Sequence, residues 1–171
     1  MHLESNRTTL EEAVSDVPAT RRERRPAAER WSVAEILEHL GIVEGSITQL
    51  LRARIDAART SGLRQELETS PIVPTVPVAR LLDRRRTIVA SARSLPTGSL
   101  DATSAWQVLT ERRRALSDFV VAADGLALSD VVIPHPILGP LNAYQWLVFV
   151  GAHEGRHAGQ IREIAGSFGA S

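Results

Sequence analysis

The chain has 171 residues, 43% of them apolar, and its 20 arginines balance 20 acidic residues without a single lysine. The absence of cysteine excludes disulfides, thiolate metal ligands and a protein thiol nucleophile, and the zero net charge argues against nucleic acid as a partner. Because there is no uncharged apolar run of about 18 residues and the N-terminal stretch is polar and acidic, we expect no membrane span and no signal peptide, but one cytoplasmic domain over residues 1–171.

The first half of the chain contains two predicted helices. Apolar residues at helical spacing predict a short helix over 9–16, with threonines three positions before glutamates in the manner of a capping box. A second helix is predicted from a cap at Ser32 to about residue 60, a length of about 42 Å at 1.5 Å per residue. Ser32 and Glu35 have the spacing of a capping box, and Gly62 follows the end of the pattern.

The second half predicts two more substantial helices. After a proline-punctuated stretch over 70–102, in which only 78–88 has a helical pattern, a helix is predicted over 103–123. Residues 133–140 contain three prolines and a glycine and predict a stiff loop. The last helix is predicted from a cap at Asn142 to about residue 167. The fold class is therefore all-α: a four-helix bundle with long crossover connections and one extra short helix.

Arginine clusters occur at 21–25, 84–86 and 112–114. Arginine binds phosphate well, but a coding bias that excludes lysine throughout the chain explains the clusters more simply. We expect these side chains to lie on the solvated surface.

Two histidines lie in the middle of the apolar face of the last predicted helix. At about 100° per residue, His153 and His157 are about 40° apart and point in the same direction as Trp146 and Ile164. Each imidazole has two nitrogens that need partners in an apolar interior, and a shared divalent cation satisfies both rings. We therefore expect a metal site here, with a pair of hydrogen-bonded core histidines as the alternative.

The spacing His-Glu-x-x-His also occurs in zinc peptidases, but the third ligand of those enzymes is missing. The extended pattern places a glycine at position 160 and a histidine at position 163, where this chain has Gln160 and Glu163. A glutamate ligand further downstream is not expected in the few residues that follow. The second predicted helix offers His39 instead, which a bundle can bring beside the last helix to complete a site of three histidines with open coordination positions.

Two further histidines are less suited to this site. His135 lies between prolines in the stiff loop, where it either caps a pocket or, as we prefer, has a structural role. His2 lies near the terminus, and we do not include it among the ligands.

Three stretches of the chain together resemble the DinB-like metal-binding family of bacterial four-helix bundles: WSVAEILEHL, HPILGPLNAYQWL and AHEGRHAGQI. The resemblance covers nearly the whole chain and implies a divalent metal ion, often nickel or zinc, held by His39, His153 and His157. It also implies a homodimer, and relatives that are S-transferases or isomerases dependent on low-molecular-weight thiols such as bacillithiol or mycothiol. The stretch 84–102 has no clear counterpart in the family pattern, and we expect it to contribute to the substrate pocket.

Two functions of different class follow. The first is a metal-dependent transferase or hydrolase that acts on a small electrophile in stress response or detoxification, with a pocket of roughly several hundred Å³ beside the metal. The second is a non-catalytic bundle or binding protein stabilised by its metal. Candidates for a catalytic role are Glu154, Tyr144 and Gln160, although Glu154 lies at the flank of the helix, where an exposed surface carboxylate is an equal alternative.

Glycines recur at four-residue spacing along the last helix, at positions 151, 155 and 159. Each costs about 1 kcal/mol in helix propensity, so we expect another helix to approach closely there. The spacing does not distinguish a helix of the same bundle from a helix across a dimer interface.

Overall fold

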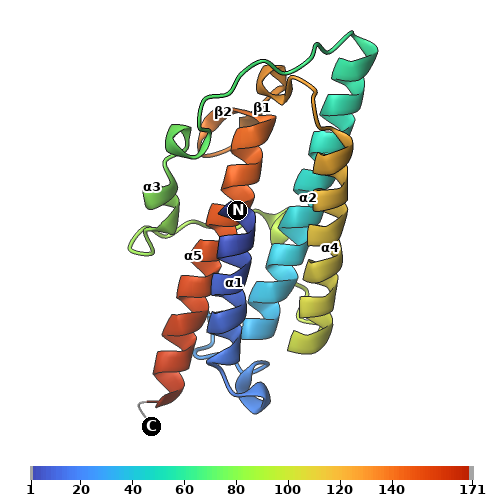
Figure 1. Ribbon diagram of the computed structural model, residues 1–171. Coiled ribbons are helices and arrows are strands. Elements are labelled where there is room, and N and C mark those ends of the chain that lie inside the picture. The colour runs from blue at the N-terminus through green and yellow to red at the C-terminus, as the bar shows by residue number, and fades with distance from the viewer. Residues whose placement is uncertain (1, 170–171) are drawn as a thin grey trace.

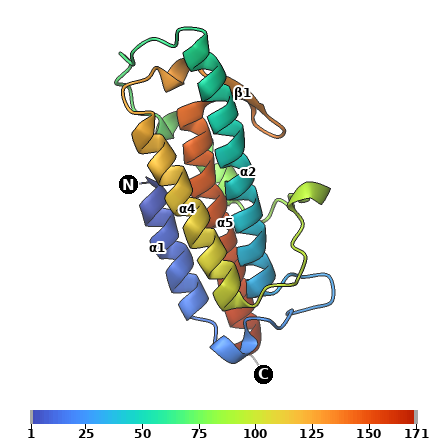
Figure 2. The same ribbon diagram turned by 90° about the vertical axis from the view of Figure 1, so that its right-hand side faces the viewer.

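The computed structural model describes residues 2–169, and four long helices make up most of it (Figure 1). They are α1 (His2–Ser15), α2 (Val33–Thr60), α4 (Ala102–Ala122) and α5 (Ala143–Gly169). Helices α1 and α5 run in one direction and α2 and α4 in the other, with α1 packed on α5 and α2 on α4 (Figures 1 and 2). Because α2 and α4 are parallel neighbours, the chain between them must return along the whole length of the bundle. The predicted all-α four-helix bundle with a long crossover is confirmed.

Local caps determine where the long helices begin. At the start of α2, Ser32 Oγ accepts from the main-chain nitrogen of Glu35 at 3.2 Å, and the Glu35 carboxylate accepts from that of Ser32 at 2.8 Å. Asn142 and Gln145 exchange the same two bonds at the start of α5, each at 2.9 Å. These contacts involve residues three apart in the chain, and the predicted caps at Ser32 and Asn142 are confirmed.

Helix α1 begins seven residues before the predicted helix. The hydroxyls of Thr8 and Thr9 donate to the carbonyls of Glu4 and Ser5 one turn earlier, so these threonines lie inside the helix and the predicted capping box is wrong. The extra turns at the N-terminus are stabilised by packing on α5 rather than by a local signal.

A line of three glycines on α5 makes this packing close: Gly151, Gly155 and Gly159. A Cβ atom at Gly151 would lie 2.8 Å from the His2 ring, and one at Gly155 would collide with the Asn6 side chain. Beside the third glycine lies the Arg84 side chain, at 3.4 Å from where a Cβ would be. The close approach that the glycine spacing predicts is therefore one inside the bundle.

The extra short helix α3 spans only Val78–Leu82, although the pattern predicts a helix over 78–88. The buried guanidinium of Arg156 donates to three main-chain carbonyls at the end of α3 and just after it, those of Leu81, Asp83 and Arg86. These bonds hold the chain after α3 in a path that is not helical.

The expected stiff loop over 133–140 is a β-hairpin. Strand β1 (Val132–His135) pairs antiparallel with β2 (Gly139–Asn142), and Pro134 lies opposite Pro140. Proline has no main-chain N–H to donate, and alternate residue pairs of an antiparallel ladder exchange no hydrogen bonds. Two prolines can therefore face each other at such a pair. The fold is thus all-α apart from this hairpin, which leads directly into α5.

Two large apolar clusters fill the bundle, one towards each end. The first includes Leu40, Leu109 and Ala158, and the second includes Ile47, Leu116 and Val150. Between these two levels, a buried charged side chain from each of α2, α4 and α5 joins a common ion network: Glu44, Arg113 and Glu154. The core is therefore divided by a polar layer. Among residues 2–169, no helix is long and apolar enough to cross a membrane.

Candidate metal centre

Three histidines meet between α2 and α5. His39 comes from the first half of α2, while His153 and His157 lie one turn apart on α5. The Nε2 atom of His153 is 3.3 Å from that of His39 and 3.2 Å from that of His157. One nitrogen from each of the three rings lies within 4.8 Å of the others. The helical angles and the third histidine expected on α2 thus lead to one cluster, the His39–His153–His157 triad.

Hydrogen bonds at the far side of two rings determine which nitrogen faces the centre of the triad. The Nδ1 atom of His39 lies 2.6 Å from the carbonyl oxygen of Ser94, and that of His157 lies 2.8 Å from the side-chain oxygen of Gln160. Because a carbonyl oxygen only accepts, both Nδ1 atoms must carry the hydrogen. The Nε2 lone pairs of His39 and His157 therefore point into the triad.

This arrangement fits a divalent cation. Three Nε2 atoms converge, and only His153 can supply a hydrogen there while the rings are neutral. The one hydrogen of His153 cannot bond well to both other nitrogens at once, whereas a cation can accept the lone pairs of all three nitrogens. Neutral imidazoles with an outer carbonyl partner are the usual donors for zinc, nickel, copper and iron.

The surroundings keep these rings neutral. His39 and His157 are buried, and His153 is partly exposed. Burial lowers the pKa of His39, although its hydrogen bond to Ser94 opposes that change. Burial lowers the pKa of His157 to about 3, with the charge of His39 as the next cause. It also lowers the pKa of His153 well below its ordinary value. All three rings are thus available as ligands near neutral pH, without loss of a proton.

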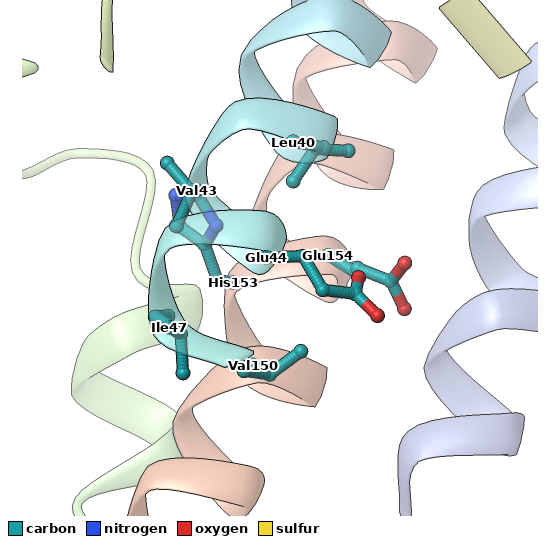
Figure 3. Close-up of a pocket in the computed structure, with 7 residues that line it drawn as sticks. All are labelled: Leu40, Val43, Glu44, Ile47, Val150, His153 and Glu154. Carbon is teal, nitrogen blue, oxygen red and sulfur yellow. The ribbon is translucent and has the colours of Figure 1, made fainter. Parts of the chain in front are cut away.

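Aromatic rings and apolar side chains flank the triad. The Trp31 ring lies 4.9 Å from the His39 ring, and Phe149 stacks on His153 at 5.5 Å between centroids. A hollow beside His153 is lined by Leu40, Val43, Glu44, Ile47, Val150, His153 and Glu154 (Figure 3). It is too narrow for a water molecule, so it is not the pocket of several hundred Å³ that an enzyme was expected to have. A larger hollow of about 370 Å³ lies where α2 and α4 begin, and no histidine lines it.

The three candidate catalytic residues have different positions. Gln160 belongs to the site, because it holds His157. Tyr144 does not touch the triad, and its hydroxyl lies 3.5 Å from the carbonyl of Leu126. Glu154 is only 1% exposed, so the alternative of a surface carboxylate is wrong. Figure 3 shows its carboxylate beside that of Glu44, both directed away from the His153 ring.

Glu154 belongs instead to a buried charged layer that takes one residue from each long helix: Arg7, Glu44, Arg113 and Glu154. Glu154 contacts Arg7 at 2.8 Å and Arg113 at 2.9 Å, and Arg113 also contacts Glu44 at 2.6 Å. Burial raises the pKa of Glu154, and the charges of Arg113 and Arg7 oppose that rise. In the sequence, the signal for this layer is a single charge that interrupts each apolar stripe.

The arginine clusters are not uniformly solvated, contrary to expectation. Arg113 is buried in the charged layer, although Arg112 and Arg114 on either side of it are exposed. In the cluster at 84–86, Arg84 is partly buried and pairs with Glu163 at 2.9 Å. Glu163 therefore belongs to a surface ion pair and not to the triad.

His135 has a structural environment in the hairpin. Its Nδ1 atom accepts from the main-chain nitrogens of Ile137 and Leu138, each at 3.1 Å, and its ring packs against Trp146 and Phe149. The residue shapes the turn of the hairpin and does not join the triad.

This environment predicts a loss of stability in acid. Burial lowers the pKa of His135 from 6.5 to about 4, so between these values the unfolded chain binds a proton that the folded chain does not. The free energy of unfolding is therefore expected to fall as the pH drops from 6.5 to 4, by up to about 3 kcal/mol for this residue. A His135→Asn variant keeps an acceptor for the turn but cannot titrate. Urea denaturation at several pH values should show a smaller loss in the variant, and parallel losses would contradict the prediction.

Comparison with known proteins agrees with the fold and with the family resemblance. A solved four-helix bundle protein, TT2238, superimposes on the chain with a TM-score of 0.60, covering 95% of this chain and 94% of its own at 19% identity. The uncharacterized protein YuaE of Bacillus subtilis is 31% identical over 142 residues, which are 82% of this chain and 80% of that protein. The family model of the DinB superfamily matches residues 2–161. The chain belongs to the DinB superfamily.

Proposed function

We propose that this protein is a metal-dependent enzyme that holds zinc or nickel with His39, His153 and His157 and acts on a small electrophile in stress response or detoxification. The convergence of three Nε2 atoms, two of them with lone pairs fixed by outer carbonyl partners, is the observation that carries the proposal. Three protein ligands leave at least one coordination position for a further ligand.

The chemistry would come from the bound ion, which lowers the pKa of a coordinated water or thiol so that hydroxide or thiolate forms near neutral pH. The chain itself has no cysteine, so a thiol nucleophile must be a diffusible co-substrate such as bacillithiol or mycothiol. Ser94 and Gln160 orient the ligand rings, and the rings of Trp31 and Phe149 reduce the access of water.

The experiment is a thiol-consumption assay with purified protein, bacillithiol or mycothiol, and a chlorinated or epoxide electrophile. Consumption above background that requires added Zn²⁺ or Ni²⁺, is lost with chelator and is lost in His153→Ala supports the proposal. The matched control is His135→Asn, which alters a histidine outside the triad and should leave the rate unchanged. Metal binding without any turnover over a panel of such electrophiles would contradict an enzymatic role.

One observation favours a second candidate, a non-catalytic bundle stabilised by its metal. The hollow beside His153 has no room for a water molecule, and a structural site needs no substrate space. In that case a chelator lowers the thermal stability, and the thiol-consumption assay shows no turnover with any combination of thiol, electrophile and metal ion.

We also propose that the protein forms a homodimer. The glycine line of α5 is covered by α1 and Arg84 within one chain, so the dimer contact must use another surface. Light scattering coupled to size-exclusion chromatography measures the mass directly, and a monomer of 18.6 kDa would contradict the dimer.

A further inference from the structure

The connection between α3 and α4 passes beside the triad without being packed into the core. No residue from 82 to 101 is buried. Residues 91–98 lie along the first half of α2 and include a 3-10 helix of one turn, Ala92–Ser94. We call this segment the strap. An exposed segment of this kind has little apolar burial to hold it in place, so its position depends on its hydrogen bonds.

Two adjacent residues of α2 make those bonds. His39 donates from Nδ1 to the carbonyl of Ser94. The buried carboxylate of Glu38 accepts three bonds from the next turn of the strap. One oxygen accepts from the main-chain nitrogen and the hydroxyl of Thr97, at 3.1 and 2.5 Å, and the other accepts from the main-chain nitrogen of Gly98 at 2.9 Å.

The shape of the strap at this point requires glycine. Gly98 has a φ of +71°, a left-handed conformation that residues with a Cβ atom rarely adopt. A Cβ atom there would lie 3.6 Å from Glu35, an ordinary contact, so an alanine would be opposed by the backbone conformation and not by a clash.

We infer that Glu38 is a positioning residue of the metal centre and acts through the strap. Its carboxylate fixes Thr97 and Gly98, and thereby the Ser94 carbonyl that holds the His39 ring with Nε2 towards His153. This inference rests on the proposed metal site. It assigns to that site a residue, Glu38, that contacts neither the ion nor the nitrogens of the three histidines. By linkage, metal binding in turn fixes the strap.

The test compares Co²⁺ and Zn²⁺ binding by the wild-type chain and by Glu38→Gln. The two oxygens of Glu38 accept from Thr97 and from Gly98, but a glutamine has only one side-chain oxygen. Its amide nitrogen would face one of these donors and could not accept from it. Loss of an outer partner of a metal-binding histidine typically lowers affinity about 10- to 100-fold. We expect a decrease of that size in titration calorimetry and an altered visible absorption spectrum of the Co²⁺ complex, because the geometry of one ligand has changed.

A pair of glycine variants provides an independent test if Glu38→Gln fails to fold. Gly98→Ala strains the strap, whereas Gly62→Ala introduces the same strain at φ +86° beyond the far end of α2, where nothing lies within 4 Å. Weakened Co²⁺ binding and a changed spectrum in Gly98→Ala alone support the inference. Equal effects in the two glycine variants would overturn it.

The outcomes separate this inference from the proposal on which it rests. A wild-type chain that binds neither ion overturns the metal site and this inference together. A wild-type chain that binds stoichiometrically, with unchanged affinity and spectrum in Glu38→Gln, overturns the role of Glu38 and leaves the metal site standing.

Discussion

Replacement of Glu154 by glutamine is expected to lower the free energy of unfolding by about 3–5 kcal/mol, which is the usual cost of removing one member of a buried ion network. Glu154 is 1% exposed and contacts Arg7 and Arg113. Without its charge, two largely buried guanidiniums share the single carboxylate of Glu44. The excess positive charge lies in a low-dielectric interior, where it has no water to solvate it.

Glu163 is a matched control on the same helix. It also contacts two arginines, Arg84 at 2.9 Å and Arg30 at 3.1 Å, but its side chain is 44% exposed. Exposed ion pairs contribute about 0–1 kcal/mol, so Glu163→Gln should lower the free energy of unfolding by no more than about 1 kcal/mol. Urea denaturation of both variants measures the difference. Similar losses in the two variants would contradict the conclusion that burial makes the inner network costly to break.

The double variant Glu154→Gln/Arg113→Gln tests the charge balance. It leaves Arg7 facing Glu44 at 3.5 Å, with one charge of each sign. We expect it to be destabilised by less than the sum of the two single variants, because each single change leaves an unpaired charge and the double change does not. An additive result would show that lost packing, rather than charge, causes the destabilisation.

Loss of any one triad histidine is expected to remove stoichiometric metal. The purified wild-type chain should hold about one divalent ion, and His39→Ala, His153→Ala and His157→Ala should each lose it, because two imidazoles remain where three converged. Metal analysis of purified protein measures this directly. Stoichiometric metal retained in His39→Ala would contradict the assignment of the third ligand.

Removal of the metal should also lower the melting temperature. A free ion at 100 times its dissociation constant stabilises the folded state by about 2.7 kcal/mol. For a chain of this length that corresponds to roughly 5–10 °C. Calorimetry with and without chelator should show this shift in the wild type and in His135→Asn, but not in the triad variants.

Much of the architecture follows from local sequence signals. The starts of α2 and α5 were predictable because each cap is formed by two residues three apart in the chain. The two histidines of α5 were predictable from helical angles alone. His39 followed from the need for a third ligand and from the family resemblance, and the structure brings it to the other two.

The remaining features depend on contacts between distant parts of the chain. The first turns of α1 rest on the glycines of α5, and the chain at the end of α3 is held by Arg156, more than 70 residues away. The Ser94 carbonyl reaches His39 through an exposed strap with no periodic pattern. The buried position of Glu154 was not predictable, because its angle on α5 shows only that it leaves the histidine face, and not that α1 and α4 place arginines opposite it.

Three directions around helix α5 each serve a different contact. One direction holds the two histidines of the triad, a second holds Glu154 of the charged layer, and a third holds the glycines that admit α1 and the Arg84 side chain. An insertion of one residue within 151–159 would rotate everything after it by about 100° and misalign several of these directions at once. Substitutions at single positions leave the other directions intact. A change in length within this stretch is therefore expected to be more disruptive than a substitution at any one of its positions.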